Sequence, residues 1–383
     1  LNCEAPTFLI SLVATDVPAS SRLYSTAVLY LGYLCSVKLM MEKRTPKQAD
    51  PIGENVQLDE AVMAKLPLGC KVLSVAPSGQ SLWVATVKIV VKLEDGKIAE
   101  YFKKGAAGSR GADMMRGTFE AEQALYTFAP EHVPKPIGWG TYSADADTHF
   151  YLCEFVEMYD DLPSARGWAT AVSDLHMSSM GKSPTQQFGF HVPTHLANVP
   201  VDNTWNPSWE AFWKQQMKSL FDQDERIHGP DEQLAALKTT FLDKAIPRYL
   251  GPLERNGRSI KPCLIHSDLW PGNIKPKTSS DELCMFDACS YWGHNEADLG
   301  ICRNPRYKLG PPCIREYLKR VPVSEPAADF DCRNAVYAMK YHALLSIMYF
   351  KDKRFRQILA DELKLLIEKM ESSPSDEDRA THL

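Results

Sequence analysis

An aspartate, an asparagine and a second aspartate are spaced along the chain in a way that suits metal-dependent phosphoryl transfer. Asp268 and Asn273 stand five positions apart in a loop that follows a short apolar segment, 261–266. A second apolar segment, 283–286, leads directly into Asp287. In phosphoryl transfer a carboxylate orients the attacking hydroxyl, while an amide and another carboxylate hold Mg²⁺ against the nucleotide phosphates. Because Mg²⁺ prefers hard oxygen ligands, we expect Asp268 to be the catalytic base and Asn273 and Asp287 to bind the metal.

The spacing between Asp268 and Asn273 occurs by chance in many chains, so its meaning depends on what surrounds it. His266 stands two residues before Asp268, as in the His-Arg-Asp loop of protein kinases. A polar turn capped by the two side chains is the structural alternative. That alternative accounts neither for Asp287 nor for the strand-rich segment upstream.

The first half of the chain has the element order of a small antiparallel lobe. Segments rich in β-branched and aromatic residues predict strands at 71–76, 82–93, 98–103, 137–142 and 148–157. Asp95 and Gly96 lie between the second and third strands, and Asp-Gly is a strong hairpin signal. Apolar residues at helical spacing predict one helix over 113–129. Strands, one helix and further strands indicate a small sheet with a single packed helix.

The second half of the chain is predicted to be mainly helical. Large apolar side chains recur at helical spacing over 208–221 and 355–370, which predicts helices that face a core. We therefore expect an α+β fold with two lobes, as in protein kinases: an antiparallel, nucleotide-binding lobe over 51–157 and a helical lobe over 158–370 that carries the catalytic loop and the substrate site.

The two ends of the chain are expected to lie outside these lobes. Residues 371–383 are rich in Ser, Pro and acidic residues, which predicts disorder. Residues 1–50 form an N-terminal extension, either helical or disordered. Within it, 23–41 are mostly apolar but interrupted by Lys38, so the segment fits either a signal anchor or a loosely attached helix. We favour the helix and no membrane contact, with the anchor left open.

A nucleotide lobe needs a lysine for the phosphates and a glutamate to hold that lysine. Lys103 ends the third predicted strand, and Glu122 lies on the predicted helix after it. Lys104 and Glu120 are competing candidates, because strand alternation points Lys103 and Lys104 to opposite faces. We choose Lys103 and Glu122.

One turn could cover the phosphates. It joins the first two strands and includes Ser78 and Gly79, whose small side chains allow backbone N–H groups to approach a phosphate. The turn lacks a GxGxxG pattern, so its signal is weak.

Composition excludes several other classes of protein. With 44% hydrophobic and 24% charged residues the chain is typical of globular proteins. Its net charge of −5 gives no reason to expect nucleic acid as a partner. The 10 cysteines include no CxxC pair, which argues against structural zinc. Their irregular spacing favours free thiols and a cytoplasmic location.

At these residues the chain resembles the fructosamine-3-kinase (ketosamine-3-kinase) family, a branch of the aminoglycoside-phosphotransferase-like kinases. Three segments carry the resemblance: HSDLWPGN at 266–273, DACSYWGHNEADLG at 287–300 and FEAE at 119–122. They are similar to the family's His-Gly-Asp-Leu-Trp-x-x-Asn motif, to its long run after the metal aspartate and to its Phe-Glu-Gly-Glu helix. The resemblance extends over roughly 60–370.

This resemblance implies a kinase that transfers phosphate from ATP, with Mg²⁺, to the 3-hydroxyl of a ketosamine, a sugar adduct on a lysine amine. The acceptor could be a free or a protein-bound lysine. In the family the 3-phosphate is unstable and its elimination frees the amine, so the activity amounts to protein deglycation. The resemblance also implies that Trp270 forms part of the sugar site and that Glu154 and Val156 flank a hinge peptide for adenine. His294 falls in a polar run after Asp287 and could line the substrate cleft.

The chain departs from the family pattern at two positions near the site. Ser267 replaces a glycine, which is a mild change unless the residue needs a positive φ. Ala288 replaces a proline. Asp298 could have one of two roles: it could line the cleft, or it could cap a helix and so order the catalytic loop. We favour the cap.

Other functions share some of these residues. A related kinase for choline, aminoglycosides or another sugar would use all of them. A pseudokinase that acts as a binding module is a different class, which the joint presence of a lysine, two aspartates and Asn273 disfavours. A hydrolase with an aspartate dyad would explain neither Asn273 nor the upstream lobe.

Overall fold

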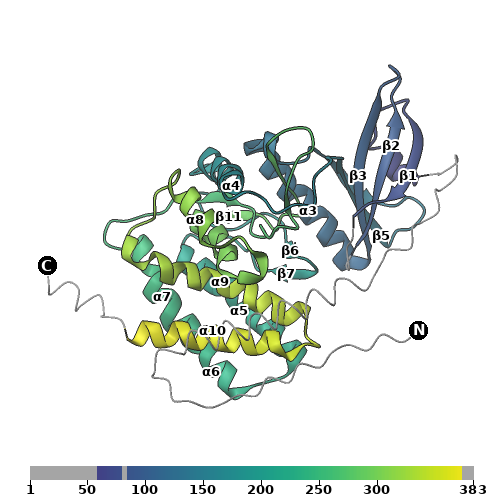
Figure 1. The fold of residues 1–383 in the computed structure, drawn as a ribbon. Helices are drawn as coiled ribbons and strands as arrows, with labels where there is room; N and C mark the ends of the chain where they lie inside the picture. Colours follow the sequence, from purple (N-terminus) through teal and green to yellow (C-terminus); the bar gives the residue numbers. More distant parts are fainter. Residues whose placement is uncertain (1–57, 80–83, 373–383) are drawn as a thin grey trace, which may run out of the picture. The chain divides into compact units, whose positions relative to one another are not determined.

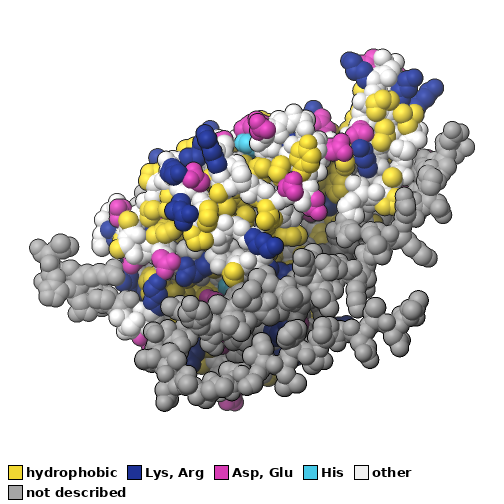
Figure 2. Space-filling view, in the orientation of Figure 1, with side chains coloured by type: hydrophobic (Ala, Val, Ile, Leu, Met, Phe, Trp, Pro, Cys, Tyr) yellow, Lys and Arg dark blue, Asp and Glu magenta, His cyan; other side chains and the backbone are white. Residues whose placement is uncertain are grey.

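The computed structural model describes residues 58–79 and 84–372 (Figure 1). The predicted N-terminal extension, its apolar segment and all but the first residues of the predicted tail lie outside this part of the chain. Among the described helices none is both long and apolar enough to cross a membrane. On the face shown in Figure 2, basic, acidic and hydrophobic side chains are interspersed over the described surface.

A five-stranded antiparallel sheet forms the N-terminal lobe, with the strand order β1-β2-β3-β5-β4. Its strands are β1 (Lys71–Pro77), β2 (Ala85–Lys92), β3 (Ile98–Ala107), β4 (Pro136–Thr141) and β5 (Thr148–Glu154). The hairpin between β2 and β3 turns at Gly96, whose φ is +85°, and the Gly96 N–H donates to the Leu93 carbonyl at 3.0 Å. The five predicted strands are confirmed, and β3 continues further than predicted.

Helices cover both faces of this sheet. The short α2 (Glu60–Met63) lies on one face, where Val62 joins a cluster that includes Tyr101 and Phe150. The long α3 (Gly108–Phe128) lies on the other face, where its two methionines pack on Tyr151 and Cys153. Because side chains alternate along a strand, β3 and β5 each send every second residue toward α3.

The C-terminal lobe is mainly helical, so the predicted two-lobed α+β fold is confirmed. Its helices are α4 (Ala165–Ser179), α5 (Trp209–His228), α6 (Glu232–Thr240), α7 (Ile246–Tyr249), α8 (Gly310–Leu318), α9 (Phe330–Met348) and α10 (Lys353–Glu371). Short strands pair as β6 (Thr194–Leu196) with β7 (Val199–Val201), β8 (Cys263–Ile265) with β11 (Tyr291–Gly293), and β9 (Ile274–Pro276) with β10 (Leu283–Met285). Short 3₁₀ segments are η1 (Pro130–His132), η3 (Gly251–Glu254), η4 (Asn295–Arg303), η5 (Pro305–Tyr307) and η6 (Ala327–Asp329), and η2 (Phe241–Ala245) is a π-helical segment.

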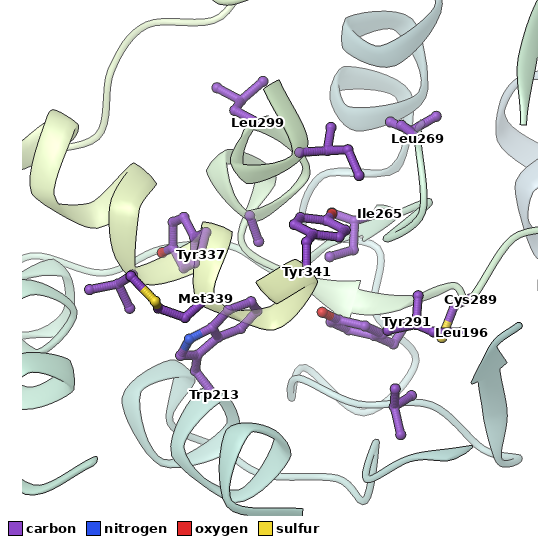
Figure 3. Close-up of a cluster of buried hydrophobic side chains, with 14 of the residues drawn as sticks. Leu196, Trp213, Ile265, Leu269, Cys289, Tyr291, Leu299, Tyr337, Met339 and Tyr341 are labelled. Atoms are coloured by element: carbon purple, nitrogen blue, oxygen red, sulfur yellow. The ribbon is translucent and has the colours of Figure 1, made fainter. Parts of the chain in front are cut away.

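Helix α9 is the central element of this lobe. Every residue from Cys332 to Ile347 is buried, as expected for a helix that is surrounded on all sides. Its side chains Tyr337, Met339 and Tyr341 lie among Trp213 of α5 and Tyr291 of β11 (Figure 3). The same cluster includes residues of β8 and of the loop that follows it (Figure 3). Helix α9 therefore forms the floor beneath that loop.

The turn η4 lies directly on α9. A Cβ added to Gly300 would come within 2.8 Å of the backbone of Tyr337, so only glycine fits there without movement. A buried ion pair joins the same two elements, with Arg333 Nε donating to Glu296 Oε2 at 2.9 Å. The position of η4 is thereby fixed by contacts on both sides of Asp298.

We expect Gly300→Ala to lower the free energy of unfolding by about 1–3 kcal/mol, because the added methyl group must displace backbone rather than a flexible side chain. Urea unfolding measures this change. The matched control is Gly138→Ala, whose new methyl group would meet only the side chain of Lys65. Equal effects of the two substitutions would contradict the close packing of η4 on α9.

Candidate active site

Two loops meet at the site because β8 pairs with β11 and β9 pairs with β10. The loop 266–273 connects β8 to β9, and the loop 286–290 connects β10 to β11. The Phe286 N–H donates to the Asn273 carbonyl at 3.0 Å, and the Cys289 N–H donates to the His266 carbonyl at 3.1 Å. The structure thus brings Asp268, Asn273 and Asp287 together, although 19 positions separate the first from the last.

Asp268 and Asn273 are in direct contact. The amide nitrogen of Asn273 donates to Asp268 Oδ2 and to the Asp268 carbonyl, each at 3.0 Å. Burial raises the pKa of Asp268 to about 7, an effect that Lys340 opposes and Asp287 reinforces. The Asp268 carboxyl can therefore accept a proton near neutral pH, as a general base must.

His266 supports the loop rather than acting on a substrate. It is fully buried, and its Nε2 donates to the Phe286 carbonyl at 3.1 Å while Nδ1 accepts from the Asp268 N–H at 3.3 Å. Burial lowers the pKa of His266 to about 4. The neutral ring can donate at one nitrogen and accept at the other, which matches these two bonds. His266 therefore fixes the backbone of Asp268.

Asp298 holds the same loop from the other side. Its carboxylate accepts hydrogen bonds from the backbone N–H groups of His266 at 2.8 Å and Ser267 at 2.7 Å, and from the ring Nε2 of His176 at 3.1 Å. Burial would raise the pKa of Asp298, but the hydrogen bond and charge of His176 outweigh it and lower the pKa. Asp298 thus orders the catalytic loop, as expected. It does so from within η4 and not as the cap of a following helix.

The lysine of the site is Lys104, and the prediction of Lys103 is wrong. Lys104 Nζ contacts Asp287 Oδ1 at 2.5 Å. Lys103 points to the other face of β3, where its Nζ donates to the Tyr142 hydroxyl at 2.6 Å. Burial would lower the pKa of Lys104, but the carboxylates of Asp287 and Glu122 outweigh it and raise the pKa. Lys104 is therefore a charged group at the junction of the lobes.

Glu122 lies beside this lysine but holds the backbone of the second aspartate. Glu122 Oε1 accepts the Asp287 N–H at 2.9 Å, and its other oxygen accepts the Tyr151 hydroxyl. Burial raises the pKa of Glu122 to about 7, while the charge of Lys104 opposes the rise. The sequence predicts that Glu122 pairs with a lysine, and Glu122 lies close enough to Lys104 for their charges to interact. The direct bonds of Glu122 join α3 to the loop after β10.

Asp287 and Asn273 present the oxygens that could hold a metal. The Asp287 side chain is 49% exposed although its backbone is held, and the Asn273 nitrogen faces Asp268, which leaves the amide oxygen for a ligand. Within the described residues no group of three His, Cys, Asp or Glu residues could hold a metal ion. Two protein oxygens suit Mg²⁺, which usually keeps waters and takes further ligands from substrate phosphates.

The remaining predicted nucleotide residues lie at or just after the ends of strands. Ser78 and Gly79 follow β1, where the Ser78 N–H donates to the Thr86 carbonyl at 3.1 Å and Gly79 has a φ of +76°. The rest of that turn lies outside the described residues. Glu154 ends β5, and Val156 follows it in the segment that leads to the C-terminal lobe. Their contact with adenine remains a prediction.

Trp270, the predicted sugar-site residue, has an exposed side chain. It is 40% exposed in the loop that carries Asp268. Its ring lies over Gly272, where an added Cβ would overlap it at 2.0 Å, and the centroid of the Tyr307 ring is 6.4 Å away. Glycine at 272 is therefore required for the ring to lie flat against the loop.

His294 does not line the cleft, so its prediction as a substrate residue is wrong. Its side chain is buried, with Nδ1 2.8 Å from the Tyr337 hydroxyl and Nε2 2.9 Å from Ser324 Oγ. Burial lowers the pKa of His294 to about 4. Trp209 also donates to the Tyr337 hydroxyl, at 2.9 Å, so His294 belongs to a polar network inside the core.

Sequence reasoning missed two groups near the catalytic loop. Tyr151 supports Glu122, and its place on the α3 face follows from strand alternation once that face is known. Lys340 reaches the loop from α9, and its Nζ lies 2.7 Å from Ser267 Oγ. Its only sequence signal is a lysine within a mostly apolar run, 335–345.

Comparison with known proteins places this geometry in a family. A family model described as fructosamine kinase matches residues 79–368. The chloroplastic protein-ribulosamine 3-kinase of Oryza sativa subsp. japonica is 28% identical over 200 residues, which are 51% of this chain and 53% of that protein. The ketosamine-3-kinase of Mus musculus is 28% identical over 221 residues, or 52% of this chain and 68% of that protein. The match thus spans about half the length of the rice relative.

Solved structures share the fold. A candidate fructosamine-3-kinase from Thermobifida fusca YX-ER1 has a TM-score of 0.59 at 21% identity, over 78% of this chain and 95% of that one. A thermostable mutant of the aminoglycoside phosphotransferase APH(4)-Ia has a TM-score of 0.54 at 13% identity, over 83% of this chain and 100% of that one. The two-lobed fold is therefore that of these kinases. With the family model matching most of the described residues, the chain belongs to the fructosamine kinase family.

Proposed function

We propose that the protein is an ATP-dependent kinase that phosphorylates the 3-hydroxyl of a ketosamine, a sugar adduct on a lysine amine. One observation carries the proposal: Asp268, Asn273, Asp287 and Lys104 converge from both lobes beside the exposed ring of Trp270. The names of the rice and mouse relatives support the choice of ribulosamine or ketosamine as acceptor.

Asp268 acts on the acceptor hydroxyl. The hydroxyl oxygen forms a bond to the γ-phosphorus of ATP as the bond from that phosphorus to ADP breaks, and the hydroxyl proton passes to the Asp268 carboxylate. The raised pKa of Asp268, about 7, makes the carboxylate a better proton acceptor than an ordinary aspartate. The Asn273 amide keeps one carboxylate oxygen fixed by its bond to Oδ2.

The opposite side of the site would neutralise the negative charge of the phosphates, through Lys104 and through the metal. Lys104 supplies a buried ammonium group for the phosphates, close to Asp287. Asn273 and Asp287 would hold Mg²⁺, which neutralises charge that develops on the transferred phosphoryl group. Glu122 keeps the Asp287 backbone in place through its bond to the N–H. In such a site the rate acceleration comes from positioning of the reactants and from electrostatic stabilisation, without a covalent intermediate.

Trp270 gives the site a preference for a sugar-like acceptor. An indole face can pack on the apolar C–H groups of a sugar, and the Trp270 ring lies in the space that Gly272 leaves open and is exposed to solvent. Elimination of the new 3-phosphate would free the lysine amine, so the overall outcome would be deglycation. Both free and protein-bound ketosamines are acceptors under this proposal.

A related small-molecule kinase is the second candidate. The fold likeness to APH(4)-Ia supports it, because that protein uses the same two-lobed architecture. Its residues for phosphoryl transfer would be the same, so only the acceptor separates the two functions.

We expect the protein to convert ATP and ribulosyl-lysine or fructosyl-lysine into ADP and a sugar 3-phosphate, seen by phosphorus NMR as a new ester signal that requires Mg²⁺. Choline and hygromycin B serve as control acceptors. Product from a control acceptor alone would assign the second candidate function. Absence of both transfer and Mg²⁺-dependent ATP binding would instead indicate a binding module.

Asp268→Asn should abolish turnover and leave ATP affinity within a few-fold, because the amide cannot accept the proton. The same variant should melt at a higher temperature than the wild type at pH 8 without nucleotide or Mg²⁺. The folded-state pKa of about 7 exceeds the unfolded value, so ionising Asp268 costs stability as pH rises toward and through 7. The advantage should shrink as pH falls toward 4.

The control for this variant is Asp281→Asn, at an exposed position before β10. It should change neither turnover nor the pH dependence of melting. Near-wild-type turnover in Asp268→Asn would remove Asp268 from the mechanism.

Lys104→Met should lower kcat on the order of 100-fold, since a charged donor at the phosphates is lost. Lys103→Met is the matched control, because it removes an equally buried lysine from the opposite face of β3. We expect it to change kcat less than about threefold in the folded fraction. A larger loss for Lys103→Met than for Lys104→Met in steady-state kinetics would reverse the assignment of the lysine.

A further inference from the structure

Ser267, the residue before the catalytic aspartate, has an unusual backbone. Its φ is +72°, in the left-handed region that favours glycine. A side chain in that region costs about 1–2 kcal/mol relative to the ordinary conformations. The replacement of the family's glycine by serine is therefore not neutral. Some contact in this chain must hold the serine in that conformation.

Lys340 makes that contact from the central helix α9. Its Nζ donates to Ser267 Oγ at 2.7 Å and to the Ser267 carbonyl at 3.0 Å. Tyr341, the next residue of α9, also donates to this carbonyl, at 3.3 Å. The Ser267 N–H donates to Asp298 at 2.7 Å. Both backbone groups of Ser267, and its hydroxyl, thus have partners from α9 or η4.

The burial of Lys340 makes a packing role alone a poor explanation. Its side chain is fully buried, and burial lowers its pKa. An ammonium group in a core is costly unless it is hydrogen-bonded or paired. Its partners here are Ser267 and the faces of surrounding rings, of which Tyr341 is nearest at 4.8 Å from Nζ. A leucine or methionine would fill the same space without that cost.

We propose that Lys340 is a positioning residue for Asp268: by binding the hydroxyl and the carbonyl of Ser267 together, it holds the left-handed turn that aims the catalytic carboxylate. Ser267 and Lys340 then act as one unit, in which the serine hydroxyl compensates for the missing glycine only because the lysine is present. This inference rests on the proposed phosphotransfer for its kinetic consequence but not for its structural one.

Pairing of Ser267 with Lys340 predicts an effect of glycine at 267 that core packing by Lys340 alone does not predict. If Lys340 serves to hold a strained serine, then glycine at 267, which adopts a positive φ without strain, should make the lysine less necessary. If Lys340 merely fills the core, a change at 267 should not repair its loss.

The test compares Lys340→Met, Ser267→Gly and the double variant in steady-state phosphorylation of a ketosamine. We expect Lys340→Met to lower kcat on the order of 10- to 100-fold, the scale of a misplaced catalytic group, with KM for ATP nearly unchanged. Ser267→Gly alone should change kcat by less than about threefold. The double variant should regain at least about tenfold of the kcat lost in Lys340→Met, because neighbouring residues in one network are not additive.

A second readout needs no activity. Hydrogen exchange of the backbone amides of 266–269 should quicken in Lys340→Met and slow again in the double variant. Lys238→Met is the control, because Lys238 is also buried but pairs with Asp224 at 2.7 Å, in the region of α5 and α6. It should alter neither kcat of the folded protein nor exchange in the loop, and Ser267→Gly should not rescue its stability.

The outcomes separate the two proposals. If the wild type transfers no phosphate to a ketosamine, the proposed acceptor fails, while rescue of loop exchange in the double variant still supports the Ser267–Lys340 unit. Unchanged kcat and exchange in folded Lys340→Met would overturn the inference. So would a double variant whose losses are the product of the two single effects.

Discussion

The site depends on one buried carboxylate that binds two consecutive backbone N–H groups. Asp298 accepts from His266 and Ser267 just before the catalytic aspartate. A carboxylate inside a core is costly unless hydrogen bonds replace its water, and His176 supplies a third bond at 3.1 Å. The packing of η4 on α9 determines where this carboxylate lies. The geometry of the reacting group is therefore decided by the core of the C-terminal lobe.

Local patterns in the sequence were enough to predict the strands, the main helices and the loop with Asp268 and Asn273, because alternation and helical spacing depend only on neighbouring residues. The choice between Lys103 and Lys104 could not be made in that way. It depends on which face of β3 the helix α3 covers, and that is a tertiary fact. Phe102 packs with Met114 and Met115 of α3, so even-numbered positions of β3 face the site.

The error at His294 has a different physical origin. A run of polar residues after a metal aspartate suggests an open cleft, yet this run is buried. Trp209 packs edge-on against the His294 ring, while Tyr337 and Ser324, both distant in sequence, bond its two ring nitrogens. Hydrogen-bonded polar side chains within a core cannot be distinguished from solvent-exposed ones by spacing. The same limit applies to Lys340, whose partner lies more than 70 residues away.

Opposite charges on the two sides of Ser267 explain how the core tolerates both of them. The peptide N–H of Ser267 points to the Asp298 carboxylate, while its carbonyl points to the Lys340 ammonium. Each buried charge thus meets the favourable end of a backbone dipole, and each also stabilises the other at longer range. Asp287 has a comparable arrangement, because Glu122 holds its N–H while Lys104 contacts its carboxylate. In both loops, charges from elements distant in sequence fix the backbone that carries the carboxylates of Asp268 and Asp287, the groups proposed to act on the acceptor hydroxyl and the metal.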